Sequence, residues 1–507
     1  MTPSTPPPPP APRPLPWGSL LCLFLLLRSL PWLLGDLWYD EVLSLQLFLL
    51  PKESLWEVFR DYRIANNHFL ANAIQWLWLR LSPAAAGSEP LLRLPSLLLS
   101  LGTLLLVQRQ WSRWLGAPLA LWTAFLLAAS PLFAAFAIYM RGYPLALFLS
   151  TLALTLLLFR LERPTFRNGL GLFLCALGLP LVMPSAATAP LALCVAGALL
   201  CREGTLPQRL RRACRLLWPL LLGASSGCAY YLTLWEDFQR ARVDSGGWSS
   251  GWLVALHLLA AFALHLLPAL LLLPQARARG GLSRPLALAG GALAAILAAL
   301  LAAAPGGHAP FPRVFLPLLP LLTLGAVLPL KGSPAFPQPP DPRVTSPGRL
   351  LPLAILPGLL LGFLGDKITQ WQMAQGAPPP QNLLQQYYRG DQGNSLWAQA
   401  LAAQAPDDGS PAPPLAINPT DAPSFLLYWN AQSPPGDTPK NRPLVFPSNR
   451  PPKHLLPPLE SGQELLLLAH NQRELQDYLA LLGLPEPIPA TAGDTRRNRT
   501  HFRLRLP

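Results

Sequence analysis

Charge is what this chain has least of. Only 13% of its 507 residues are Asp, Glu, Lys or Arg, and 51% are hydrophobic, whereas a soluble domain carries roughly a quarter charged residues. So few charges cannot cover a water-exposed surface of this size, which excludes a soluble globular protein. The apolar residues come in blocks near the roughly 20 residues that a helix needs to cross a bilayer. The sequence therefore predicts a polytopic integral membrane protein covered mostly by lipid.

Cysteine is also scarce, and its placement excludes two kinds of site. All six cysteines lie within or beside apolar blocks, and none follows Cys228, so neither a disulfide framework nor a zinc-binding spacing is present. The net charge of +14 does not indicate nucleic-acid binding, because the arginines lie in short loops between apolar blocks and form no basic face. Membrane lipids are the partners that this pattern favours.

The apolar blocks predict about eleven membrane spans, and the arginines predict their orientation. Cytoplasmic loops hold the excess of Lys and Arg. One set of alternate loops holds most of the Lys and Arg found between the predicted spans, which places the N-terminus in the cytoplasm and the chain after residue 365 outside. The protein is thus expected in the inner (plasma) membrane. The predicted spans are residues 15–34, 91–107, 117–136, 143–160, 168–183, 186–201, 216–234, 252–273, 285–304, 313–330 and 350–364.

This alternation requires that residues 69–81 do not cross the membrane. They are apolar but too few to span it, and a stretch of that length lies in the interface or re-enters. Trp76 and Trp78 suit an interfacial helix, because indole rings favour the headgroup region. We therefore expect residues 35–90 to form an outer loop that lies along the membrane.

The predicted fold is mainly α, a transmembrane helical bundle with a small outer domain. Residues 1–14 are a Pro-rich cytoplasmic tail, and residues 15–364 form the membrane domain. After residue 365 the chain becomes polar and Pro-rich, with short apolar runs at 414–417, 444–446 and 464–469. Helical patterns lie between them at 395–404, 421–430 and 472–482. Such alternation predicts a small extracytoplasmic α/β domain over residues 365–507.

Two adjacent carboxylates follow the first predicted span. Asp40 and Glu41 lie in the run Leu37-Trp-Tyr-Asp-Glu-Val-Leu-Ser44, close to the bilayer, where a carboxylate is costly unless it is paired, bound to a metal or used in chemistry. The pair suits a general base together with a ligand for a divalent metal ion. The alternative is that Asp40 merely caps an interfacial helix.

Polar residues in other predicted outer segments suit the binding of an anion. Asn66, Asn67 and His68 precede the short helix, whose N-terminal amides favour negative charge. Arg141 lies between Tyr139 and Tyr143 in a very short outer loop. A guanidinium there matches a phosphate, although an arginine that snorkels to the headgroups would look the same.

Arg313 stands at the outer start of another predicted span, in Phe311-Pro-Arg-Val-Phe-Leu-Pro317. It is a second candidate ligand for a phosphate, and contact with lipid headgroups is the alternative.

Taken together, these motifs resemble the bacterial polytopic glycosyltransferases of GT-C type, which include protein O-mannosyltransferases and lipid A aminoarabinose transferases. The resemblance covers roughly residues 15–330, and more loosely 397–430. The motifs that carry it are Trp38-Tyr-Asp-Glu41, Asn67-His68, Arg93-Leu-Pro-Ser96, Ser130-Pro131 followed by Tyr139-Met-Arg-Gly-Tyr143, and Pro312-Arg313 followed by Pro317 and Pro320. Phe69 and Leu70 stand where the family commonly has proline after His68, which leaves the role of His68 open.

The resemblance implies an enzyme that moves a hexosyl or pentosyl group, with inversion, from a polyprenyl-phosphate sugar to a lipid, glycan or protein acceptor on the outer face. Asp40 would be the base or metal ligand, with Glu41 as its partner. The residues expected at the donor phosphate are Arg141, Arg313, His68 and Asn67. A transporter or flippase of lipid-linked glycans, or a non-enzymatic membrane assembly protein, remains the alternative.

Overall fold

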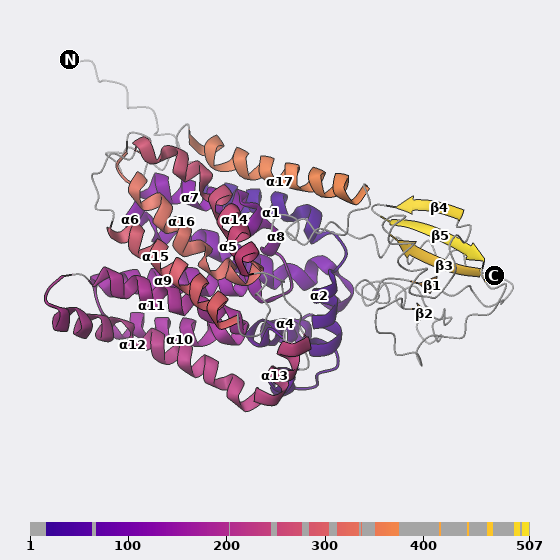
Figure 1. The fold of residues 1–507 in the computed structure, drawn as a ribbon, viewed down its shortest axis with the longest axis horizontal. Helices are drawn as coiled ribbons and strands as arrows, with labels where there is room; N and C mark the ends of the chain where they lie inside the picture. The colour runs from indigo at the N-terminus through magenta and orange to yellow at the C-terminus, as the bar shows by residue number, and fades with distance from the viewer. Residues whose placement is uncertain are drawn as a thin grey trace, which may run out of the picture.

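A computed structural model gives the structure of the protein (Figure 1). It describes residues 17–62, 67–201, 203–244, 251–275, 283–303, 312–333, 336, 350–374 and five short strands near the C-terminus. The predicted tail over residues 1–14, Asn66 and the predicted helices after residue 395 lie outside the described residues.

Most of the described chain is helical. The longer helices are α1 (Trp17–Leu33), α4 (Phe69–Leu81), α5 (Glu89–Gln110), α7 (Ala117–Ala129), α9 (Gly142–Glu162), α10 (Phe166–Val182), α11 (Thr188–Leu200), α12 (Leu206–Ala229), α13 (Trp235–Asp244), α14 (Gly251–Leu272), α15 (Ser283–Ala303) and α17 (Leu351–Ala374). The shorter ones are α2 (Tyr39–Leu43), η1 (Ser44–Leu49), α3 (Leu55–Arg60), η2 (Pro83–Gly87), α6 (Ser112–Leu115), α8 (Pro131–Phe136), η3 (Pro184–Ala187), η4 (Tyr230–Leu234), η5 (Leu273–Gln275), η7 (Pro312–Leu318), α16 (Leu319–Val327) and η8 (Leu328–Leu330).

The helices agree with the predicted spans, and the chain is an integral membrane protein. Each of the eleven predicted segments is largely helical. Five described segments are long and apolar enough to cross a bilayer: Glu89–Leu115, Gly142–Glu162, Val254–Leu272, Ser283–Ala303 and Arg313–Leu330. Five more are apolar but shorter. The count of eleven crossings, and the side on which each end lies, stay predictions.

The bundle packs through close helix pairs. α10 lies along α12, and α11 lies along α15. Glycines allow this approach: a Cβ at Gly291 would stand 2.3 Å from the carbonyl oxygen of Ala192, and a Cβ at Gly223 would stand 2.3 Å from that of Phe173. Small residues of this kind let helix backbones approach closely where lipid supplies no hydrophobic driving force.

The segment between α1 and α5 forms a layer of short helices at one end of the bundle, where Figure 1 shows α2 and α4. α4 spans 13 residues, Phe69–Leu81, as predicted. The indole N–H of Trp76 donates to the carbonyl of Lys52 (3.0 Å) and that of Trp78 to the carbonyl of Leu91 (2.8 Å). These bonds tie α4 to the chain before and after it.

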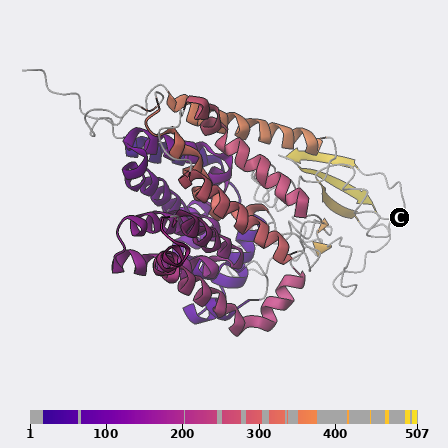
Figure 2. The same ribbon diagram turned by 60° about the vertical axis from the view of Figure 1, so that its left-hand side comes forward.

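The strands form one mixed sheet beyond the C-terminal end of α17 (Figures 1 and 2). The strands are β1 (Leu415–Ala416), β2 (Leu444–Val445), β3 (Glu464–Ala469), β4 (Thr491–Arg496) and β5 (Arg499–Arg505), in the order β2-β1-β3-β5-β4. β1 is parallel to β2 and β3, whereas β5 is antiparallel to β3 and β4. The three predicted apolar runs coincide with β1, β2 and β3, but β4 and β5 were not predicted. The α/β domain as a whole stays a prediction.

Candidate functional site

Asp40 lies inside the first turn of α2, and its side chain is almost inaccessible to water. The N-cap of α2 is Trp38, so the alternative that Asp40 caps this helix is wrong. Asp40 is only 5% exposed. Its Oδ2 lies 3.4 Å from Nη2 of Arg313, which belongs to η7 and is more than 200 residues away in the sequence. The tertiary structure thus brings a buried carboxylate and a guanidinium together.

Glu41 is completely buried, and each of its carboxylate oxygens accepts two hydrogen bonds. Oε1 accepts from Nε of Arg93 (3.1 Å) and from the backbone N–H of Met140 (2.9 Å). Oε2 accepts from Nη2 of Arg93 (2.7 Å) and from the backbone N–H of Trp38 (2.9 Å). A carboxylate offers about four lone-pair sites, so these bonds occupy the capacity of Glu41.

Arg93 joins the elements that carry the site, although the sequence singled it out only as part of a motif. It lies near the start of α5 and is 2% exposed. Besides Glu41, its guanidinium donates to the carbonyls of Trp32 (2.6 Å), Gly35 (2.6 Å) and Asp36 (2.9 Å), at and beyond the end of α1. The signal that marks it is a charge set within an apolar run, which is costly in a membrane unless it has a partner.

Arg141 reaches α2 from the start of α9. Its Nη1 donates to the backbone carbonyl of Asp40 (2.8 Å) and lies 3.4 Å from the hydroxyl of Ser44. Its Nη2 lies 2.9 Å from Nε2 of His68. Arg141 is 3% exposed, so it is a buried residue of the site and does not snorkel to the headgroups.

His68 is held as a neutral ring. The backbone N–H of Gly142 lies 2.8 Å from Nδ1, and Arg141 lies at Nε2. A protonated ring accepts no hydrogen bond and a neutral one accepts one, so both neighbours favour the neutral form. Burial, followed by the positive charges of Arg141 and Arg313, lowers the pKa of His68 well below its ordinary value. A Cβ at position 142 would stand 2.3 Å from Nδ1, so glycine is required there.

Asn67 is engaged in the local structure that starts α4. Its Nδ2 makes a short hydrogen bond to the backbone carbonyl of Asp61, and its Oδ1 accepts from Nδ2 of Asn72 (2.7 Å). Asn67 is therefore beside His68, and its amide fixes the turn that carries the imidazole.

Arg313 is the fourth residue of the group, and it pairs with the carboxylate of Asp40. Its guanidinium carbon lies 5.3 Å from the centre of the Trp38 ring, a distance at which a cation is attracted to the ring face. Asp40, Arg141, His68 and Arg313 thus form one buried cluster, as their sequence positions alone could not establish.

Among the described residues, no group of three or more His, Cys, Asp or Glu side chains is arranged to hold a metal ion. The oxygens of Glu41 accept from four donors, and Asp40 faces a guanidinium. A divalent metal ion at Asp40 and Glu41 stays a prediction.

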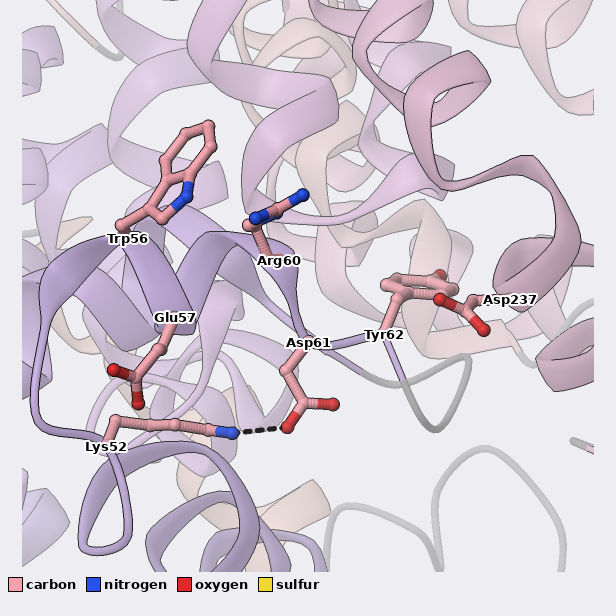
Figure 3. A pocket seen from close by; sticks show the side chains of 7 residues that line it. All are labelled: Lys52, Trp56, Glu57, Arg60, Asp61, Tyr62 and Asp237. Carbon is pink, nitrogen blue, oxygen red and sulfur yellow. Dashed lines mark hydrogen bonds and ion pairs between the residues drawn. The ribbon is translucent and has the colours of Figure 1, made fainter.

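A pocket of about 480 Å³ is lined mainly by the segment between α1 and α5, which also carries Asp40 and His68 (Figure 3). Its wall includes Asp61, whose carbonyl accepts from Asn67, the neighbour of His68. Nζ of Lys52 lies 2.5 Å from Oδ2 of Asp61, and the guanidinium of Arg60 lies 5.4 Å from the centre of the Trp56 ring. The lining residues are Lys52, Trp56, Glu57, Arg60, Asp61, Tyr62 and Asp237.

Comparison with known proteins locates this fold. Neither the scan of family models nor the search of curated proteins finds a match. Among solved structures, ArnT from Cupriavidus metallidurans matches in the apo state (TM-score 0.55) and bound to undecaprenyl phosphate (TM-score 0.54). Each match has 14% identity and covers 96% of this chain and 97% of that one.

A further match is the arabinosyltransferase EmbB from Mycobacterium smegmatis, with 15% identity and a TM-score of 0.42, over 71% of this chain and 32% of that one. The ArnT matches extend over nearly the whole length of both chains. The protein therefore has the fold of ArnT, a lipid A aminoarabinose transferase, as the resemblance to GT-C-type glycosyltransferases predicted.

Proposed function

We propose that the protein is a membrane glycosyltransferase that moves a sugar from a polyprenyl-phosphate donor to an acceptor on the outer face of the membrane. The observation that carries the proposal is the buried cluster in which the carboxylate of Asp40 faces Arg313, while Arg141 donates to the backbone carbonyl of the same residue. The fold shared with ArnT, one structure of which holds undecaprenyl phosphate, supports the lipid-linked donor.

The cluster has the charges that direct displacement at an anomeric carbon requires. The carboxylate of Asp40 accepts the proton of the acceptor's attacking group as that group bonds to the anomeric carbon. The bond from that carbon to the phosphate oxygen breaks, and the phosphate leaves with the electron pair. Arg313 and Arg141 stabilise the charge of the departing phosphate. A single displacement of this kind inverts the anomeric centre.

Glu41 and Arg93 act as positioning residues in this mechanism. Their ion pair links α2 to α5, and Arg93 also binds the carbonyls after α1, so the pair sets where Asp40 stands. His68, as a neutral ring against Arg141, orients that guanidinium. Asn67 holds the turn that carries His68.

A space of only about 10 Å³ lies beside Arg141, between α4, α5 and α9. Most of its lining is apolar: Ala71, Ile74, Pro95, Leu99, Met140 and Leu145, together with Gln75, Ser96 and Arg141. These helices must move apart before a polyprenyl chain can lie between them with its phosphate at Arg141.

The pocket of Figure 3 is where we place the polar part of the acceptor. It combines an exposed Trp56, 63% accessible, with carboxylates and cations. All its lining residues except Asp237 belong to the segment between α1 and α5, which also carries Asp40 and His68. An aromatic face with charged hydrogen-bonding groups around it suits a polar, ring-containing ligand.

The test is Asp40→Asn, assayed for sugar transfer from a polyprenyl-phosphate sugar by the purified protein in lipid. The amide keeps the shape of the side chain but accepts no proton, so the rate should fall about 10²-fold to 10⁴-fold. Glu53→Gln, an exposed acidic residue on the same segment, is the control and should leave the rate unchanged. A wild-type rate for Asp40→Asn would disprove the role of Asp40.

Trp56→Ala separates the acceptor pocket from the donor site. It should reduce transfer to the acceptor while breakdown of the donor in water continues at the wild-type rate. Equal loss of both reactions would contradict the placement of the acceptor.

A transporter or flippase of lipid-linked glycans, or an assembly protein, would show no transfer in these assays. Transporters commonly place charged groups near the middle of the bilayer. In the five long apolar segments that the structure describes, the acidic residues are Glu89, the first residue of one segment, and Glu162, the last residue of another. This arrangement favours the enzyme.

A further inference from the structure

A third pocket, of about 530 Å³, lies at the opposite end of α9 from Arg141. α9 has 21 residues, which at 1.5 Å per residue corresponds to about 31 Å. Figure 1 shows α2 and α4 at one end of the bundle and the connection between α11 and α12 at the other. This pocket is therefore far from Asp40, and the proposed mechanism makes no use of it.

Arginine dominates the lining of this pocket. Arg160, Arg212, Arg215 and Arg284 come from three helices, α9, α12 and α15, and only Glu162 and Glu203 oppose them. Four positive charges against two negative ones leave an excess of two. The pocket is therefore a basic site built from separate helices.

The two glutamates do not neutralise the arginines that remain. Glu162 binds Arg113 (2.6 Å), which is outside the pocket, and also accepts from the indole of Trp114 (2.7 Å). Glu203 pairs with Arg212 (3.1 Å). Within the described part of the chain, no acidic side chain pairs with Arg215 or Arg284.

Arg160 has a different role from the other three arginines. It is 7% exposed, and its guanidinium donates to the carbonyls of Leu216 (3.0 Å), Arg215 (3.0 Å) and Thr165 (3.1 Å). These bonds tie α9 to α12 and hold Arg160 as a buried positive charge of the pocket, whereas Arg215 and Arg284 are exposed.

The remaining lining is apolar and continues into surface that suits lipid. Leu158, Leu161, Leu200 and Leu216 line the pocket. On α12, Leu210 is 57% exposed and Trp218 is 54% exposed, on either side of Arg215 along the chain. Large apolar side chains exposed beside arginines fit the boundary between headgroups and acyl chains.

We propose that this basic pocket binds the phosphate headgroup of an anionic phospholipid. Guanidinium groups bind phosphate oxygens through two parallel N–H bonds, and basic pockets between membrane helices at the cytoplasmic side suit such headgroups. The phosphate of the headgroup supplies the negative partner for Arg215 and Arg284. The acyl chains lie against the leucines and Trp218. A bound lipid would link α12 to α15.

The test compares two triple variants in phosphatidylcholine nanodiscs with and without phosphatidylglycerol. Arg212→Gln, Arg215→Gln and Arg284→Gln together empty the pocket of its accessible charge. Arg163→Gln, Arg167→Gln and Arg211→Gln remove the same charge from exposed arginines at the same end that do not line the pocket. Native mass spectrometry measures retained phosphatidylglycerol, and titration of a fluorescent phosphatidylglycerol gives its dissociation constant.

The pocket variant should bind phosphatidylglycerol about thirty-fold more weakly, which corresponds to two lost phosphate contacts, and the control variant less than threefold more weakly. Both variants should melt like the wild type in phosphatidylcholine alone, which shows that they fold. Equal losses in the two variants would mean general attraction to basic loops and would overturn the proposal. Displacement of the lipid by inorganic phosphate at similar concentration would overturn its assignment to a lipid.

Discussion

Arg93 and Glu41 form an ion pair at the junction of α1, α2 and α5, with side-chain exposures of 2% and 0%. Replacing a buried pair by apolar residues is often tolerated, whereas removing one partner leaves a buried charge uncompensated. The pair is therefore worth more as a fixed geometry than as net stability. Arg313, which faces Asp40, lies more than 200 residues after this pair in the sequence. Several distant elements must therefore pack together before Asp40 is positioned.

Arg93→Met should destabilise the protein by about 3–5 kcal/mol, because Glu41 keeps its charge without its main partner. Unfolding by SDS in mixed micelles measures this loss. Adding Glu41→Gln should recover part of the stability, since it removes the buried charge and its single amide oxygen still accepts from one of the two backbone N–H groups, that of Met140 or that of Trp38, but it should not recover transfer activity. Full recovery of activity in the double variant would show that the pair does not position Asp40.

His68 makes the stability of the protein depend on pH. Its pKa in the folded state lies well below its ordinary value, because of burial and the charges of Arg141 and Arg313. The unfolded chain therefore binds a proton that the folded one does not, so this contribution to stability is fully present above about pH 6.5 and declines as the pH falls below it.

The free energy of unfolding of the wild type should thus decrease between pH 6.5 and 5 by at most about 1.4 kcal/mol per pH unit from this group, and the melting temperature should decrease with it. In His68→Gln the same range should show a smaller decrease. Melting curves at matched ionic strength provide the measurement, and parallel pH dependences in the two proteins would assign the effect to other groups.

At the scale of the elements, the close pair of α11 and α15 can be probed at two adjacent glycines. Gly291→Ala would place a Cβ 2.3 Å from the carbonyl oxygen of Ala192, whereas at Gly290 the nearest atom, on Leu199, is 3.4 Å away. The first change must push the helices apart, and the second fits with a small shift of a side chain.

We expect Gly291→Ala to cost about 1–3 kcal/mol, as overpacking commonly does. Gly290→Ala should be neutral or slightly stabilising, because alanine favours helix over glycine by up to about 1 kcal/mol. Thermal unfolding in detergent compares them directly. The same loss at both positions would show that α15 does not face α11 through Gly291.

At the scale of the whole molecule, the pocket of Figure 3 and the basic pocket lie at opposite ends of the bundle, so we expect them to face opposite sides of the membrane. The basic loops predict that the end with Gln208 is cytoplasmic and the end with Glu53 is outside. In a background without the native cysteines, a cysteine at Gln208 should react with an impermeant maleimide only in inverted vesicles. One at Glu53 should react only in intact cells. Reaction of Glu53→Cys from the cytoplasm would reverse the orientation and move the proposed site to the wrong face.

The sequence alone was enough to predict the class of protein, the positions of the long apolar helices and the bounds of α4. These follow from apolar blocks of fixed length and from local polar boundaries such as His68 and Ser82, which depend only on neighbouring residues. It also named Asp40, Glu41, His68, Arg141 and Arg313 as chemistry-bearing, because charges beside apolar blocks are costly without a use.

Which of these side chains meet depends on the packing of the whole bundle. Arg93 binds Glu41 across 52 residues and Arg141 binds the carbonyl of Asp40 across 101, and no local pattern encodes such pairs. Hydropathy reports whether a residue prefers lipid or water, whereas the partner of a buried charge depends on how helices pack and rotate. Asp40 faces Arg313, whereas the carboxylate of Glu41 accepts from Arg93 and two backbone amides. This difference between the two neighbouring carboxylates is visible only in the packed bundle.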